Sequence, residues 1–140
     1  MSNSIFVSRD DTFPLTVYYV KEGDFAVRKP DDLTEDEKNS DEYDSVTIKF
    51  TLPDHSISKM LMRRSTTFVG GASTFDHGTF NNILFEILAK SWDLKDDNGK
   101  AIDFDVMKLN DMRPDIVRAF VEQLQNELDD RGLYMAILQS

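Results

Sequence analysis

The sequence contains no cysteine among its 140 residues. It therefore has no disulfide framework, no thiolate nucleophile and no zinc–thiolate site. Histidine is nearly as scarce, because only His55 and His77 are present, in separate turn-like segments. A histidine metal site or a Ser-His-Asp triad needs supporting groups that this pattern does not supply. We therefore expect no catalytic residue, no metal ligand and no cofactor-binding residue, and we interpret the chain as a non-enzyme.

Long hydrophobic runs are absent as well. No stretch approaches the roughly 20 apolar residues that a membrane-spanning helix needs. The first residues, Met1-Ser2-Asn3-Ser4, lack the basic region and apolar run of a signal peptide. These features predict a cytoplasmic protein with no membrane partner.

Basic residues are few relative to acidic ones, with 16 Lys and Arg against 26 Asp and Glu and a formal net charge of −10. Such a surface is repelled by nucleic-acid phosphates and by anionic lipids, so neither is an expected partner. It suits a soluble protein, a basic protein partner, or mimicry of nucleic-acid charge. The chain has the length and the hydrophobic content, 40%, of one globular domain spanning residues 1–140.

Three segments have the composition or alternation of β-strands. Residues 13–20 are rich in β-branched and aromatic side chains, and residues 25–28 follow a turn and are expected to return beside them. Residues 45–52 alternate, with Val46, Ile48 and Phe50 on one face. Between these strands, residues 31–44 hold eight acids and one Lys, which predicts a solvated, mobile acidic loop.

Two longer segments have the periodicity of amphipathic helices, residues 76–92 and residues 114–129. Pro114 stands where a first-turn proline belongs. The expected fold is α+β, with a small antiparallel sheet or hairpin packed against these two main helices. The apolar stripes consist of Phe80, Ile83, Leu84, Ile87, Leu88 and Trp92 in the first helix, and Ile116, Val117, Phe120, Val121, Leu124 and Leu128 in the second.

Each of two polar clusters can be interpreted either as a binding site or as an ordinary solvated surface. Residues 94–105 have the glycine spacing of a calcium loop, but Leu94 occupies the first ligand position and Asp105 the last, which favours a polar turn. Lys59, Arg63 and Arg64 form a basic cluster that suits a phosphate or an acidic partner. A solvated helix face explains the same cluster and is the favoured interpretation.

The apolar tail, residues 133–138, either packs back on the domain or docks on another chain, and we favour docking, including a possible homo-oligomer. Trp92 is interpreted as core at a helix end or as an exposed anchor. The candidate partner-binding residues are Trp92, Phe120, Leu124, Leu128, Tyr134, Ile137 and Leu138.

The segment from Trp92 to Pro114 resembles a known protein family. Trp92-Asp93-Leu94, the Asn98-Gly99-Lys100 turn, a short connection and Arg113-Pro114 opening a helix resemble the C-terminal half of tail assembly chaperones of tailed phages. The resemblance covers about residues 45–130 and is strongest over residues 82–128. Arg113 stands where members often have a second proline, and residues 13–28 and 31–44 have no clear counterpart.

The resemblance implies a non-catalytic function in the cytoplasm of the infected host cell. Such proteins bind the long tape measure protein, help to recruit tail tube protein around it, and are absent from the mature virion. Many are also made in a longer, frameshifted form. The alternatives are a virion structural protein (a tail completion, baseplate or decoration subunit) and an acidic phage-encoded inhibitor of a basic host protein.

Overall fold

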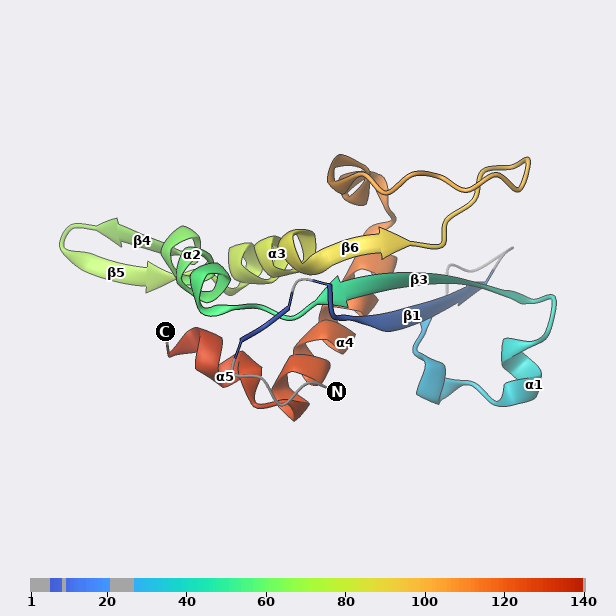
Figure 1. The fold of residues 1–140 in the computed structure, drawn as a ribbon, viewed down its shortest axis with the longest axis horizontal. Helices are drawn as coiled ribbons and strands as arrows, with labels where there is room; N and C mark the ends of the chain where they lie inside the picture. The colour runs from blue at the N-terminus through green and yellow to red at the C-terminus, as the bar shows by residue number, and fades with distance from the viewer. Residues whose placement is uncertain (1–5, 9, 21–26, 140) are drawn as a thin grey trace.

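The computed structural model describes residues 6–8, 10–20 and 27–139, and it has the α+β fold expected from the sequence. The molecule is elongated: a hairpin projects from one end and a short helix lies at the other (Figure 1). Between them, an antiparallel sheet packs against helices. A single hydrophobic cluster joins the sheet to the helices, so the central part of the chain has one core.

The main sheet has four antiparallel strands in the order β2-β1-β3-β6. β1 (Thr12–Val20) and β3 (Tyr43–Thr51) pair along their whole lengths, from Thr12 opposite Thr51 to Val20 opposite Tyr43. β2 (Val27–Arg28) pairs with the end of β1. These elements confirm the predicted strands near 13–20 and 45–52. Residues 25 and 26 of the predicted return strand lie outside the described residues.

β3 supplies the central part of the core. The predicted alternation is confirmed, because Val46, Ile48 and Phe50 are buried while Lys49 is exposed. The Phe50 ring packs against Phe85 and Phe120, with ring centroids 5.9 and 6.2 Å away. Burial of large aromatic side chains contributes much of the stability of a small domain, so this aromatic group joins the sheet to both long helices.

The first predicted long helix ends earlier than its periodicity suggests. α3 (His77–Leu88) begins after Asp76, whose Oδ1 caps the helix by accepting a hydrogen bond of 3.0 Å from the Thr79 amide. Ala89–Trp92 then forms β6, which pairs with β3. The prediction of helix through residue 92 is therefore wrong. The free edge of β3 offers hydrogen-bond partners for this segment, and a tertiary pairing overrides the local pattern.

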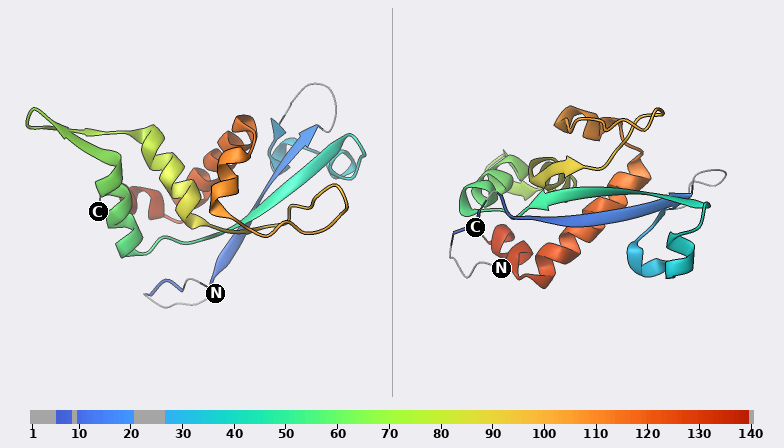
Figure 2. Two further views of the ribbon diagram at one scale, coloured as in Figure 1. Left: turned by 90° about the horizontal axis from the view of Figure 1, so that it is seen from above. Right: turned by 45° about the vertical axis from the view of Figure 1, so that its right-hand side comes forward.

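The second predicted long helix is confirmed. α4 (Pro114–Asp130) runs against the sheet and contacts β1 and β2 (Figure 2). Gln123 Nε2 donates a hydrogen bond of 2.9 Å to the Thr16 carbonyl oxygen, which ties the helix to the backbone of β1. Gly132, with φ of 74°, then turns the chain into α5 (Leu133–Leu138). The left-handed backbone at this residue favours glycine.

The acidic segment contains more regular structure than predicted. It includes η1 (Pro30–Asp32) and α1 (Glu35–Lys38), and Tyr43 and Asp44 already belong to β3. The Thr34 hydroxyl accepts a hydrogen bond from the Glu37 amide, and the Glu37 carboxylate accepts one from the Thr34 amide. This reciprocal capping box stabilises the helix start. Leu33 is buried, so the segment is not wholly a solvated loop, and its mobility stays a prediction.

The segment after residue 54 contains both a helix and a hairpin. α2 (His55–Ser65) is capped by Asp54, whose Oδ1 accepts a hydrogen bond of 2.8 Å from the Ile57 amide. β4 (Thr66–Val69) and β5 (Ala72–Phe75) then form a separate two-stranded sheet, in which they pair with no other described strand. Gly70 and Gly71 connect them with φ of 59° and 82°, the positive values of a two-residue hairpin turn.

Candidate protein-binding surfaces

The three candidate residues on α4 belong to the core. Phe120, Leu124 and Leu128 have relative exposures of 0%, 1% and 0%. Phe120 packs against Phe50 and Phe85 inside the domain. A partner cannot touch these side chains in this structure, so the prediction that they form a binding surface is wrong. A core stripe and a docking stripe have the same periodicity, which is why the sequence did not separate them.

The tail packs back on its own domain. α5 lies against α2 and α4, and the Ile137 side chain is only 2% exposed. Tyr134 and Leu138 are partly buried against the core, and the Tyr134 ring meets Phe80 edge to face at 5.9 Å. Burial also raises the pKa of the Tyr134 hydroxyl, with a further contribution from the nearby Asp129 carboxylate. Ile137 is therefore core, and the expectation that it docks on another chain is wrong, whereas docking through the partly exposed Tyr134 and Leu138 stays a prediction.

Trp92 anchors the long connection that follows β6. Its indole N–H donates a hydrogen bond of 2.7 Å to the Ile102 carbonyl oxygen, and its ring meets Phe104 at 4.8 Å. The side chain is half-buried, at the end of a strand and not of a helix. It therefore fixes the path of residues 93–105 and is not an exposed anchor.

The predicted polar turn within residues 94–105 is confirmed. Asp96 Oδ1 accepts hydrogen bonds of 2.9 Å from both the Asn98 and the Lys100 amides, and Gly99 has φ of 78°. The carboxylate that would serve as a calcium ligand instead closes the turn. Among the described residues, no group of His, Asp or Glu side chains is arranged to hold a metal ion.

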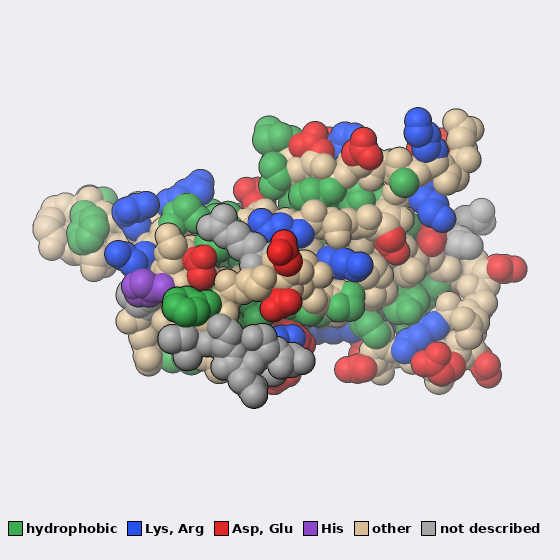
Figure 3. Space-filling model, in the orientation of Figure 1, with side chains coloured by type: hydrophobic (Ala, Val, Ile, Leu, Met, Phe, Trp, Pro, Cys, Tyr) green, Lys and Arg blue, Asp and Glu red, His purple; other side chains and the backbone are tan. Residues whose placement is uncertain are grey.

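An exposed apolar patch follows this connection on η2 (Val106–Asp111). Val106 is 42% and Met107 69% exposed, while Leu109 of the same helix is buried. Asp105 caps the helix by accepting a hydrogen bond of 2.9 Å from the Met107 amide. Hydrophobic side chains are visible over this part of the surface in Figure 3. We call Val106 and Met107 the η2 patch; it lies inside the segment that resembles the chaperones.

The second exposed apolar feature is the projecting hairpin, residues 66–75, which we call the arm. Phe68 and Val69, next to its tip, are 78% and 75% exposed. Neither was predicted as a binding residue. The signal was present in the sequence, because Gly70-Gly71 separates two short segments rich in Thr and Phe, a hairpin pattern.

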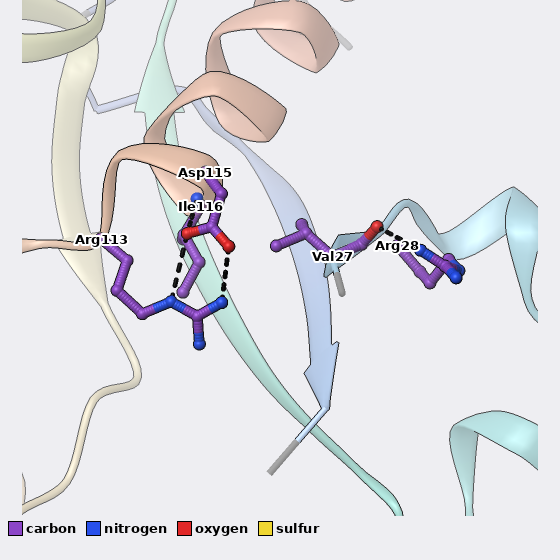
Figure 4. Close-up of polar contacts among 5 residues, drawn as sticks. All are labelled: Val27, Arg28, Arg113, Asp115 and Ile116. Atoms are coloured by element: carbon purple, nitrogen blue, oxygen red, sulfur yellow. Dashed lines mark hydrogen bonds and ion pairs between the residues drawn. The ribbon is translucent and has the colours of Figure 1, made fainter. Parts of the chain in front are cut away.

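A polar cluster fixes the start of α4 (Figure 4). Arg113 donates from Nε and Nη2 to the two carboxylate oxygens of Asp115, at 3.1 and 2.5 Å, and its guanidinium lies 5.8 Å from the Tyr19 ring centre. Hydrogen bonding from Arg113 lowers the pKa of the Asp115 carboxyl, and burial, followed by Asp44, raises the pKa of the Tyr19 hydroxyl. Because the charged groups are paired with one another, we interpret the cluster as structural.

Comparison of the chain with protein-family models, with curated proteins and with solved structures finds no match. In the part of the chain that the structure describes, no helix has both the length and the apolar character needed to cross a membrane. The exposed surfaces and the sequence from Trp92 to Pro114 are therefore the features that bear on function.

Proposed function

We propose that this protein is a non-catalytic tail assembly chaperone that binds a phage tape measure protein and aids assembly of tail tube protein around it. The observation that carries the proposal is the exposed η2 patch. It lies within residues 82–128, the segment whose sequence resembles that family. Its residues, Val106 and Met107, are 42% and 69% exposed. The proposal places the protein in the host cytoplasm and outside the mature virion.

The chemistry of the patch suits a helical apolar partner. A methionine side chain is flexible and polarisable, so it adapts to the varied residues along a long helix better than a branched side chain does. The half-buried Trp92 and Phe104 pair holds the connection that leads into η2. A net charge of −10 on the rest of the chain keeps a complex with an aggregation-prone partner dispersed.

Co-expression with the long helical protein encoded in the same phage genome tests the proposal. We expect the partner to stay in solution and to co-purify with the wild-type chain. The variant Met107→Asp places a charge in the apolar contact and is expected to weaken capture at least about tenfold, which corresponds to about 1.4 kcal/mol. The matched control is Asn110→Asp, which adds the same charge at an exposed position of the same helix.

Three results would contradict the proposal or redirect it. Failure of the wild-type chain to hold the partner in solution contradicts chaperone function. Equal capture by the two variants contradicts the η2 patch as the contact. Detection of the protein in purified phage particles favours the virion structural alternative, whereas salt-sensitive binding to a basic host protein favours the inhibitor.

A further inference from the structure

The arm and the adjacent helix form a basic region in an otherwise acidic protein. Residues 55–75 contain Lys59, Arg63 and Arg64 and no acidic side chain. All three are exposed, and they take part in none of the ion pairs between described residues. Lys and Arg side chains are visible beside the base of the arm in Figure 3. We call this region, the arm with its three cations, the basic end.

The opposite end of the molecule carries the densest negative charge. The eight acids of residues 31–44 are all exposed. Six of them belong to η1, α1 and the start of β3, and Asp41 and Glu42 belong to the turn between α1 and β3. These segments lie at the far end of the long axis from the arm (Figures 1 and 2). The molecule is therefore an elongated body whose two ends have opposite charge.

A surface hollow lies next to this acidic region, between β1, η1 and α4, and its wall is partly apolar and partly polar. Its volume is about 380 Å³. Pro14, Leu15 and Pro30 contribute apolar wall, Thr16, Gln123 and Asn126 contribute polar wall, and Lys29 contributes one cation. Its acidic side chains are Asp31 and Asp130, which take part in none of the ion pairs between described residues, and Glu127, which pairs with Arg131. An apolar group flanked by cations is the chemistry that complements such a hollow, and this chain presents that combination at its basic end.

We propose that the arm of one copy docks in this hollow of a second copy, so that the protein associates head to tail. Phe68 and Val69 fill the apolar part of the hollow, and the cations at the base of the arm face the neighbour's acidic residues. Burial of two large side chains that are now 78% and 75% exposed supplies the hydrophobic gain. The opposed charges orient the encounter. This self-association does not depend on the η2 patch.

The charge pattern also selects head-to-tail over symmetric pairing. Two arms side by side would bring Arg63 and Arg64 of both copies together, and two acidic ends would repel each other in the same way. A contact between two different surfaces leaves one arm and one hollow free on every dimer. It therefore continues into a ring if the rotation closes, or into an open chain if it does not.

Sedimentation velocity on two surface variants and their mixture tests the proposal. The arm variant combines Phe68→Ser with Arg63→Glu, and the hollow variant combines Asp31→Lys with Asp130→Lys; all four positions are exposed. The matched charge control is Asp97→Lys with Asp103→Lys, on the distant 93–105 connection. Unchanged melting temperatures verify that every variant is folded.

We expect the wild type and the control to form species larger than dimers as concentration rises. Each surface variant alone should associate at least tenfold more weakly. A one-to-one mixture of the two should form a dimer and stop there, because the mixture retains one intact arm and one intact hollow per pair. A wild type that stays monomeric overturns the proposal, as does an arm variant that assembles normally. A surface variant that dimerises normally on its own while the wild type forms only dimers indicates symmetric pairing and also overturns it.

Discussion

Ile137 tests whether the tail is core or interface. The side chain is 2% exposed, on a helix that packs against α2 and α4. Truncation of a buried Ile to Ala costs about 2–5 kcal/mol, and the cost grows with the void that remains. Here Ile137 borders a surface groove of about 590 Å³, together with Leu133, Ala136 and Pro53. Water can enter the enlarged groove, so no sealed void forms.

We therefore expect Ile137→Ala to cost about 2–3 kcal/mol, in the lower part of the usual range. At roughly 3 °C per kcal/mol for a chain of this length, the melting temperature should fall by about 6–9 °C. The matched control is Met135→Ala on the same helix, where the side chain is 52% exposed. Its effect should stay within about 0.5 kcal/mol.

Urea unfolding and differential scanning calorimetry measure both variants. If Ile137→Ala and Met135→Ala have equally small effects, the tail does not pack as described and the interface interpretation returns. If Ile137→Ala destabilises but leaves the sedimentation behaviour unchanged, the tail is structural, as the burial of its side chain indicates.

Three further outcomes follow from the packing and the caps. Phe120→Ala should cost about 3–5 kcal/mol by urea unfolding, whereas the exposed Asn126→Ala on the same helix should stay within about 0.5 kcal/mol. Gln123→Ala removes the hydrogen bond to β1 and should cost about 1 kcal/mol by the same measurement, although Gln123 lies off the apolar stripe. Hydrogen bonding from the Thr79 backbone lowers the pKa of the Asp76 carboxyl below its ordinary 3.8, so this cap stabilises α3 above that pH and loses its effect as the pH falls further. Asp76→Asn, which keeps an oxygen acceptor, should make thermal melts less sensitive to acid, and an unchanged acid sensitivity would contradict this role.

The sequence predicted the elements that have strong periodicity. The alternation in β3 and the stripe of α4 reflect burial on one face, and each segment is long enough for the pattern to be unambiguous. The end of α3 could not be read in this way. Ala89–Trp92 continues the helical stripe, and only the presence of a free β3 edge, a tertiary fact, makes it a strand.

The surfaces were predicted less well than the fold. Periodicity identifies a buried stripe but does not say whether the same domain or a partner covers it, so Phe120 and Ile137 were assigned to a partner. The arm had a local sequence signal in Gly70-Gly71, and the capping box had one in the spacing of Thr34 and Glu37. Both signals depend on turn and cap chemistry and not on the apolar pattern. The exposure of Met107 had no signal in the sequence, since it depends on which face of η2 meets the core.

The hydrogen bond from the Trp92 indole to the Ile102 carbonyl oxygen makes the intrinsic fluorescence of Trp92 a probe of this region. The chain has a single tryptophan, so all indole emission comes from one known environment, against Phe104 and beside the connection that enters η2. Loss of this hydrogen bond would expose the indole to water and shift its emission to longer wavelength. A titration read at this wavelength would therefore follow events at the η2 patch without any attached dye, while events at the distant arm leave the signal unchanged.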